Sequence, residues 1–333
     1  MAERIGILGA GSWGTALGMH IARRGHQVCL WDIDRAHVEA VAAERCNQRY
    51  LPGIAFPDGL TISADLDQTC AEADRLLVVT PSHAFGQTLT RIRACLTADS
   101  GLAWATKGFE PGTGRLLHEL AADVLGEAVP LALITGPSFA REVAEGLPTA
   151  VTVAATSPEF GARWAALLHG DNFRAYYTAD LPGAELGGAL KNVLAVACGI
   201  ADGLGLGGNT RAALITRGLA EMMRLGRALG ASPLTLTGLA GVGDLVLTCT
   251  GDLSRNRRLG LALAEGKDLE QALADIGQVV EGVNTAEEAM RLAERYQVDM
   301  PITEQVHGIL FKGWNARKGV QVLMERELKP ETD

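Results

Sequence analysis

Three glycines near the start of the chain constrain its fold more than any other feature of the sequence. They form Gly9-Ala-Gly11-Ser-Trp-Gly14, between an apolar run (Arg4–Leu8) and an amphipathic run (Trp13–Arg24). In this pattern the first glycine permits a tight turn, the second lets backbone approach a pyrophosphate, and the third lets a helix lie close to a strand. The helix would present unpaired N–H groups to the phosphates. The position between strand and helix favours dinucleotide binding over a purely structural turn.

The rest of the first half alternates short apolar runs with amphipathic ones. Strands are expected at Arg4–Leu8, Gln27–Trp31, Arg75–Thr80, Leu102–Thr106, Leu131–Thr135 and Ala150–Ala154. Helices are expected at Trp13–Arg24, Ala36–Glu44, Ala84–Leu96, Gly114–Leu125, Phe139–Glu145 and Pro158–His169. Such alternation predicts an α/β, Rossmann-type domain with a doubly wound, mostly parallel sheet.

The pattern changes near Leu181, after which only helical periodicity is visible. Helices are expected at Ala184–Leu204, Thr210–Leu229, Arg257–Glu265, Leu269–Ile276, Ala286–Tyr296 and Thr303–Lys312, interrupted at Gly199–Gly208 and Thr237–Gly251. We therefore expect a dinucleotide-binding domain at 1–182, an all-helical substrate and catalytic domain at 183–328, and a frayed tail at 329–333.

Composition excludes several classes of protein. The 333 residues suffice for two domains, and a net charge of −9 disfavours nucleic-acid binding. The six cysteines are scattered without metal-ligand spacing, so we expect no metal site and mostly buried, reduced thiols. No secretory signal and no apolar run of about 18 residues is visible, which favours a cytoplasmic protein without membrane insertion.

A carboxylate follows the second expected strand. Asp32 lies 18 residues beyond Gly14, close to the spacing at which an acidic residue accepts a hydrogen bond from the adenosine ribose. The same carboxylate would repel a 2′-phosphate, so it favours NAD over NADP. As alternatives, Asp32 caps the next helix, or Arg35 nearby compensates and admits NADP.

Lys191 is a charged residue within an apolar helical stretch. Its helical neighbours three, four and seven residues away are uncharged: Gly187, Gly188, Leu194, Ala195 and Cys198. An ammonium in such dry surroundings has a lowered pKa, which suits general acid–base catalysis. We expect Lys191 to be catalytic, and a snorkelling surface lysine is the alternative.

Asp244 is a second isolated charge, in the Gly-rich segment Gly238–Thr248. A carboxylate there needs a partner. A lysine or a substrate hydroxyl would serve, and the alternative is a helix N-cap.

Ser254-Arg255-Asn256 begins an expected helix, where cations oppose the helix dipole unless an anion binds. This favours a phosphate site over a solvated basic face. Lys107 and Gly136–Ala140 follow the ends of expected strands, where doubly wound sheets bind ligands.

These segments resemble those of bacterial NAD(P)-dependent glycerol-3-phosphate dehydrogenases. They occur in the family's order over nearly the whole chain: Gly9–Leu17, Lys107–Gly108, Gly136–Ala140, Leu190–Val193, Gly241–Asp244, Ser254–Asn256 and Val280–Gly282. Relatives usually have a small and then a basic residue after the second-strand Trp, where this chain has Asp32-Ile33-Asp34. This departure disfavours a strict NADP preference.

The resemblance implies hydride transfer at C2 between sn-glycerol 3-phosphate and dihydroxyacetone phosphate, supplying glycerol 3-phosphate for phospholipid synthesis. It implies Lys191 as the proton acceptor, with Lys107 and Asp244 also catalytic. The implied substrate contacts are Lys107, Gly136, Ser138, Lys191, Asn192, Asp244, Thr248, Ser254, Arg255 and Asn256. The cofactor contacts expected from the Gly-rich turn, the second strand and the resemblance are Gly9, Gly11, Ser12, Trp13, Gly14, Asp32, Ile33, Lys107, Ala140, Arg255, Val279 and Glu281. Family analogy also favours a homodimer.

Two other functions fit parts of the sequence. A two-domain 3-hydroxy acid or hydroxyacyl-CoA dehydrogenase would share the architecture but needs no phosphate clamp at Ser254–Asn256. A non-catalytic NAD-binding regulator would share the Gly-rich turn. It gives no reason for isolated charges at Lys107, Lys191 and Asp244.

Overall fold

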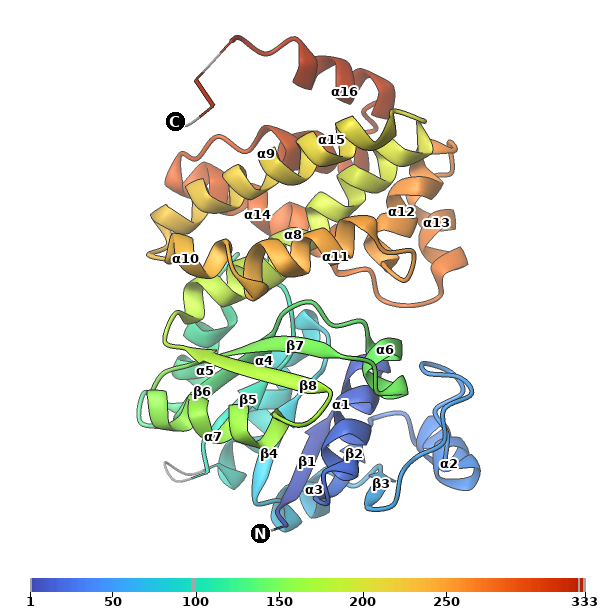
Figure 1. Ribbon diagram of the computed structural model, residues 1–333, viewed down its shortest axis with the longest axis vertical. Helices are drawn as coiled ribbons and strands as arrows, with labels where there is room; N and C mark the ends of the chain where they lie inside the picture. Colours follow the sequence, from blue (N-terminus) through green and yellow to red (C-terminus); the bar gives the residue numbers. More distant parts are fainter. Residues whose placement is uncertain (1, 97–99, 329, 332–333) are drawn as a thin grey trace.

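The computed structural model describes residues 2–96, 100–328 and 330–331, which form a sheet half and a helical half (Figure 1). The sheet half contains β1 (Arg4–Leu8), β2 (Gln27–Trp31), β3 (Leu60–Ser63), β4 (Arg75–Val78), β5 (Leu102–Trp104), β6 (Leu131–Thr135), β7 (Thr149–Ala155) and β8 (Phe173–Thr178). They form one sheet in the order β3-β2-β1-β4-β5-β6-β7-β8. All neighbours are parallel except β6 and β7. The predicted α/β, mostly parallel fold is confirmed.

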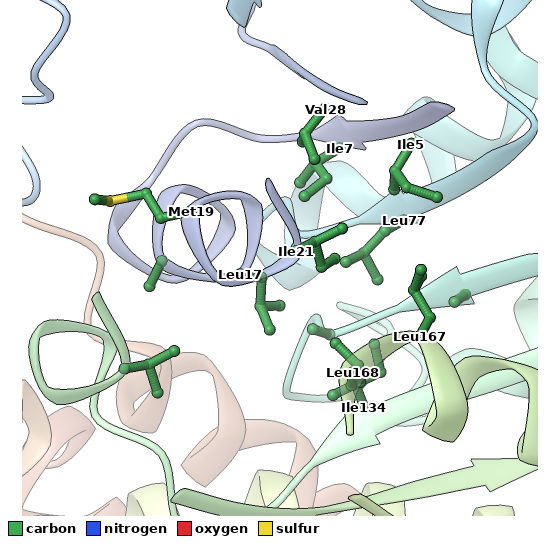
Figure 2. Close-up of a cluster of buried hydrophobic side chains, with 14 of the residues drawn as sticks. Ile5, Ile7, Leu17, Met19, Ile21, Val28, Leu77, Ile134, Leu167 and Leu168 are labelled. Atoms are coloured by element: carbon green, nitrogen blue, oxygen red, sulfur yellow. The ribbon is translucent and has the colours of Figure 1, made fainter. Parts of the chain in front are cut away.

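Helices cover the sheet and bury its apolar side chains. They are α1 (Ser12–Arg23), α2 (Arg35–Glu44), α3 (Leu66–Glu72), α4 (Ser82–Ile92), the 3-10 helix η1 (Arg93–Cys95), α5 (Leu117–Leu125), α6 (Ala140–Glu145) and α7 (Pro158–Leu168). Figure 2 shows part of the core between them, where Leu17 of α1, Leu77 of β4 and Leu168 of α7 belong to one buried cluster. The strands are apolar because both faces of a parallel sheet are covered by helices.

From Leu181 onward the described residues form helices and no strand. These are α8 (Leu181–Gly203), α9 (Gly207–Ala228), α10 (Pro233–Leu236), the π-helix η2 (Leu239–Gly243), α11 (Asp244–Thr250), α12 (Arg255–Ala264), α13 (Leu269–Ile276), α14 (Glu281–Tyr296), α15 (Pro301–Phe311) and α16 (Ala316–Met324). Asp180 begins α8 by accepting a hydrogen bond from Gly183 N at 3.0 Å. The helical half therefore starts at a capped helix boundary.

The central helix α8 is buried by the other helices around it. Contrary to the expectation from sequence, α8 is long and apolar enough to cross a membrane by composition, with a mean hydropathy of 1.3. The most apolar 18 residues of α8 are all buried inside the protein, which accounts for their apolarity. A second segment, Pro233–Thr250, meets the same criteria and is 39% buried. It comprises α10, η2 and α11.

Close backbone contact holds α12 against α8. A Cβ added at Gly260 of α12 would lie 2.2 Å from the Val196 carbonyl oxygen of α8, and one at Gly199 would lie 2.1 Å from the Arg257 carbonyl oxygen. No side chain fits at either position. The two glycines therefore let α12 lie directly on the helix that carries Lys191.

Several elements differ from the expectation. The strands β3 and β8 and the helices α3, α10 and α16 were not predicted, and Thr237–Gly251, expected as a break, contains η2 and α11. The helix expected from Gly114 begins at Leu117 because Gly112 and Gly114 have positive φ. The helix expected at Ala84–Leu96 is α4, which starts earlier at Ser82 and passes into η1. β3 and β8 lie at the two sheet edges, where a strand needs no continuous apolar run.

Two smaller expectations concern the cysteines and the tail. All six cysteines are free, and Cys46, Cys70, Cys198 and Cys249 are buried, as predicted. Of the tail expected to fray, residues 329 and 332–333 lie outside the described part of the chain.

Candidate active site

The Gly-rich turn joins β1 to α1 as the sequence predicts. Gly9 has a φ of +118°, and Gly14 lies so close to it that a Cβ at Gly14 would be 2.0 Å from the Gly9 carbonyl oxygen. A Cβ at Gly11 would meet no other segment of the described chain within 4 Å, and none of the described side chains caps the α1 N-terminus. The backbone of the turn thus requires glycine at Gly9 and Gly14, whereas glycine at Gly11 leaves the outer surface of the turn open. This geometry fits the phosphates of a dinucleotide.

Asp32 follows β2 directly and lies beside this turn. Its Oδ2 accepts a hydrogen bond from Ala10 N at 3.1 Å, and its Oδ1 accepts one from Asp34 N at 3.0 Å. The neighbouring Asp34, not Asp32, caps α2. Asp32 therefore braces the Gly-rich turn, and the capping role weighed as an alternative belongs to Asp34. Ile33 next to it is 74% exposed.

The other residues expected to bind cofactor lie around the same edge of the sheet. Ser12 Oγ donates to the Tyr50 carbonyl oxygen at 2.7 Å, and the indole N–H of Trp13 is buried without a partner among the described residues. Ala140 begins α6, and Val279 is 41% exposed just before α14.

Lys107, Lys191 and Asp244 meet in one cluster between the two halves. Lys107 follows β5, Lys191 lies in the middle of α8, and Asp244 is the first residue of α11. Lys107 Nζ donates to Asp244 Oδ2 at 2.8 Å, and Lys191 Nζ donates to Asp244 Oδ1. The side chains are 17%, 8% and 1% exposed for Lys107, Lys191 and Asp244. The partner that the isolated Asp244 was expected to need is thus a pair of lysines.

The charges of this cluster set its protonation. Burial lowers the pKa of the Lys191 amine to about 7; the charge of Asp244 opposes this shift, and that of Lys107 adds to it. Burial alone would raise the pKa of Asp244, but the two ammonium groups outweigh it and lower that pKa. Asp244 consequently stays a carboxylate while Lys191 can gain or lose a proton near neutral pH.

The π-helix η2 places Asp244 beside the two lysines. A Cβ at Gly241 would lie 1.9 Å from the Leu236 carbonyl oxygen, so only glycine fits this turn. Asp244 follows η2 directly, with Gly243 in the N-cap position. Asp244 is therefore not the N-cap considered from the sequence. Thr248 one turn later donates to the Asp244 carbonyl oxygen at 2.6 Å.

A chain of amides connects α8, α12 and α14. Asn256 Nδ2 donates to Asn192 Oδ1 at 2.9 Å, and Asn256 Oδ1 accepts from Gly282 N at 2.9 Å. Ser254 is buried and caps α12 by accepting from Arg257 N at 3.2 Å. The side chains of Ser254 and Asn256 therefore engage the protein itself. Of the expected phosphate clamp, Arg255 has an exposed side chain, 3.5 Å from Gln278 Oε1.

The loop after β6 packs against the same region. Ser138 Oγ donates to the Gly136 carbonyl oxygen at 2.9 Å, and Gly136 has a φ of +131°. A Cβ at Gly243 would lie 3.6 Å from Pro137 of this loop. Gly136 and Ser138 are thus placed beside the π-helix that precedes Asp244.

Glu281 at the start of α14 reaches across to the sheet half. Its carboxylate accepts from Ser82 N at 3.3 Å and from Ser82 Oγ at 2.8 Å, at the start of α4. Burial raises the pKa of Glu281. Glu281, expected as a cofactor contact, therefore also joins the two halves next to the ends of β4 and β5.

Glu185 and His118 belong to this interface but were not predicted from sequence. Glu185 of α8 is 4% exposed and binds both the backbone N–H and the ring of His118 in α5. The available signal was the one used for Lys191, because Glu185 is also a lone charge in the apolar segment Ala184–Leu190.

The Gly-rich turn and the lysine cluster share one edge of the sheet. Gly9 follows β1, Lys107 follows β5, and β4 lies between these strands. The strand order reverses at β1 and β4, and in doubly wound sheets ligands bind outside the carboxyl ends of the strands at this point. The arrangement can therefore bring a dinucleotide to a pair of lysines held by one carboxylate.

Comparison with known proteins identifies the family. The pattern for the N-terminus of NAD-dependent glycerol-3-phosphate dehydrogenase matches residues 4–161, and that for its C-terminus matches residues 180–321. The chain is 58% identical to glycerol-3-phosphate dehydrogenase [NAD(P)+] of Stenotrophomonas maltophilia over 330 residues, 99% of this chain and 97% of the relative. It is 57% identical to that of Xanthomonas campestris pv. campestris over 329 residues, 99% of this chain and 96% of the relative.

A solved structure gives the same result. The crystal structure of glycerol-3-phosphate dehydrogenase from Coxiella burnetii superposes with a TM-score of 0.94 at 49% identity, covering 98% of this chain and 99% of that one. The sequence motifs, the two-part fold and these relatives agree over nearly the whole length. The chain belongs to the NAD-dependent glycerol-3-phosphate dehydrogenase family.

Proposed function

We propose that this protein interconverts sn-glycerol 3-phosphate and dihydroxyacetone phosphate with NAD or NADP. The observation that carries the proposal is the buried cluster in which Lys107 and Lys191 share the carboxylate of Asp244. Family membership supports the same reaction, and a role in supplying glycerol 3-phosphate for phospholipid synthesis follows from it.

Lys191 moves the proton in this reaction. With a pKa of about 7, its amine accepts the proton of the C2 hydroxyl during oxidation and returns it to the C2 oxygen during reduction. Lys107 polarises the C2 oxygen. Asp244 holds both amines, so that Lys107 and Lys191 face the same oxygen.

The cofactor site lies on the Gly-rich turn. When bound, the nicotinamide dinucleotide accepts or supplies the hydride at C2. Gly11 and the α1 N-terminus would hold its pyrophosphate, and Asp32 the adenosine ribose. Ser12, Trp13, Ile33, Ala140, Val279 and Glu281 would complete the contacts.

Arg255 is the expected anchor for the substrate phosphate. It lies at the N-terminus of α12, where backbone N–H groups add to its guanidinium. Ser254 and Asn256 shape this corner through their contacts with α12, α8 and α14. Binding a non-reacting phosphate there would orient C2 toward Lys191. Gly136, Ser138, Asn192 and Thr248 would line the remaining wall.

The proposal is tested by following oxidation of NADH and of NADPH with dihydroxyacetone phosphate and with unphosphorylated dihydroxyacetone. We expect kcat/KM to fall by at least about a hundredfold without the phosphate, since its charged contacts supply binding energy to the reacting centre. Equal rates on both ketones would refute the phosphate anchor and favour a hydroxy acid dehydrogenase. Binding of NADH without turnover of either ketone would favour a regulator.

The assembly and organisation of the chain complete the proposal. We infer a cytoplasmic homodimer from family resemblance, with a dinucleotide-binding domain up to residue 182 and a substrate domain from 183. Light scattering coupled to size-exclusion chromatography tests the dimer, for which the expected mass is twice that of the chain.

A further inference from the structure

Acidic side chains of the helical half reach across to the sheet half at several places. Among the described residues, four carboxylates do so, and three of them bind neutral or weakly basic donors rather than a lysine. The contacts are Asp244 with Lys107, Glu281 with Ser82, Glu288 with Gly112 and Glu185 with His118. In each of these four contacts the accepting carboxylate comes from the helical half.

Through its contact with His118, Glu185 caps the N-terminus of α5, a helix of the sheet half. No side chain of its own segment caps α5, whose N-cap position is Leu116. Glu185 Oε1 instead accepts the His118 backbone N–H at 2.9 Å, and Glu185 Oε2 contacts His118 Nδ1. A carboxylate at a helix N-terminus is favoured by both the free N–H groups and the dipole. Glu185 thus attaches α8 to α5 at a defined position.

The same part of α8 supports Lys107. Lys107, Thr135, Glu185 and Gly188 line one small gap between the halves. A Cβ at Gly188 would lie 3.7 Å from Lys107 Cγ and 3.0 Å from Thr135 Oγ1, so the lysine stem runs directly over α8. A shift of α8 at Glu185 would therefore move the surface against which Lys107 lies.

We propose that Glu185 and His118 are positioning residues for the reaction, and that their contact fixes α8 against the sheet half so that Lys107 and Lys191 meet on Asp244. The kinetic consequences rest on the proposed function, whereas the geometry of the three charged groups does not. Neither residue touches the reacting atoms in this assignment.

The contact between Glu185 and His118 also bears on the pKa of Lys191, through the position of Lys107. The charge of Lys107 helps to lower the pKa of Lys191, so withdrawal of Lys107 would let that pKa rise. The charged groups that face the contact are few: Glu185 and Glu119 face His118, while His118 and Glu119 face Glu185. Burial raises the pKa of Glu185; burial alone would lower that of His118, but Glu185 outweighs it.

Four variants separate positioning from stability. E185L removes the contact, whereas E185Q keeps an acceptor for the His118 N–H and a donor for its ring. H118A removes the His118 ring and leaves its backbone N–H in place, so it tests the ring part of the contact if E185L does not fold. E221L is the matched control, because Glu221 is also a buried carboxylate that caps a distant helix, accepting from Thr303 N at 3.1 Å and Thr303 Oγ1 at 2.9 Å. Both ends of that contact lie within the helical half.

The first measurement needs no turnover. Trace labelling of Lys191 by acetic anhydride across pH, followed by mass spectrometry, reports the midpoint at which its amine becomes reactive. We expect the midpoint to rise by about one pH unit in E185L and H118A, since a like charge moves away. The midpoint should stay near the wild-type value in E185Q and E221L.

The second measurement is steady-state reduction of dihydroxyacetone phosphate. In E185L and H118A we expect kcat to fall about tenfold with KM changed less than about twofold, because the phosphate anchor lies elsewhere. E185Q should recover most of the rate, and E221L should lower thermal stability alone.

The outcomes distinguish the two proposals. Unchanged labelling midpoints and kcat in E185L, or in H118A if E185L does not fold, would overturn the positioning role. The same shift in E221L as in E185L would also overturn it. A wild-type midpoint near 7 that rises in E185L, in a protein that does not turn over dihydroxyacetone phosphate, would support the positioning role and refute the proposed function.

Discussion

The Gly-rich turn lies within six consecutive residues, whereas the lysine cluster joins side chains 137 and 53 residues apart along the chain. Backbone geometry fixes the turn: Gly9 has a positive φ, and Gly14 leaves no room for a Cβ. Charge and burial fix the cluster, and its parts come from both halves of the molecule. A change in the turn should therefore act on binding, and a change in the cluster on chemistry.

Lys191→Ala should give the largest effect. It removes the group that we propose exchanges the proton, so kcat should fall about a thousandfold, within the range of general acid–base catalysis. NADH affinity, measured by fluorescence titration, should change little because the turn is intact. Lys267→Ala is the control, since Lys267 is an exposed lysine of the helical half paired with Asp275. Wild-type turnover in Lys191→Ala would remove the distinction between the two regions.

Two substitutions in the Gly-rich turn test whether this region acts on cofactor binding. Gly14→Ala places a Cβ 2.0 Å from a carbonyl oxygen, so it should cost about 1–3 kcal/mol of stability as well as cofactor affinity. Gly11→Ala meets no protein atom, so its thermal unfolding should be near that of the wild type. Its NADH affinity should still fall by about tenfold or more, since the methyl group would occupy the surface that we propose faces the phosphates. Wild-type NADH affinity in Gly11→Ala would contradict the assigned site.

The pH dependence of the reaction rates should depend on the lysine cluster and not on the Gly-rich turn. In the proposed mechanism oxidation needs the neutral Lys191 amine, so its kcat/KM should rise up to a pH of about 7 and level off above it. Reduction needs the protonated form, so its rate should fall above a pH of about 7. Below that value oxidation should drop about tenfold per pH unit. Steady-state rates in both directions measure this, and the same trend in both would contradict the role of Lys191. Gly11→Ala should keep both profiles.

Cofactor preference should give the smallest effect. We expect NADH to be used at least as efficiently as NADPH, because the carboxylate of Asp32 repels a 2′-phosphate. Asp32→Asn removes that charge and keeps an acceptor for Ala10 N, so the ratio of the two kcat/KM values should shift toward NADPH by about tenfold or less. A strong preference for NADPH in the wild type would show that Asp32 does not control the choice.

The sequence predicted the features that depend on neighbouring residues better than those that depend on packing between distant segments. The alternation of strands and helices, the Gly-rich turn and the helical second half could be predicted because each depends on local periodicity or on a local φ requirement. The edge strands β3 and β8 and the π-helix before Asp244 could not. Edge strands need little apolar signal, and a π-helix is set by its packing.

By itself, the sequence determined where isolated charges occur in apolar segments, and this pointed to Lys191 and Asp244. Only the tertiary structure decided which polar groups meet: Lys107 joins Asp244, Asn256 binds Asn192 of α8 and Gly282 of α14, and Glu185 holds His118 across the interface. The physical reason is that periodicity and backbone strain act over a few residues. The energy of a buried charge depends instead on groups that the fold brings within a few ångströms from distant parts of the chain.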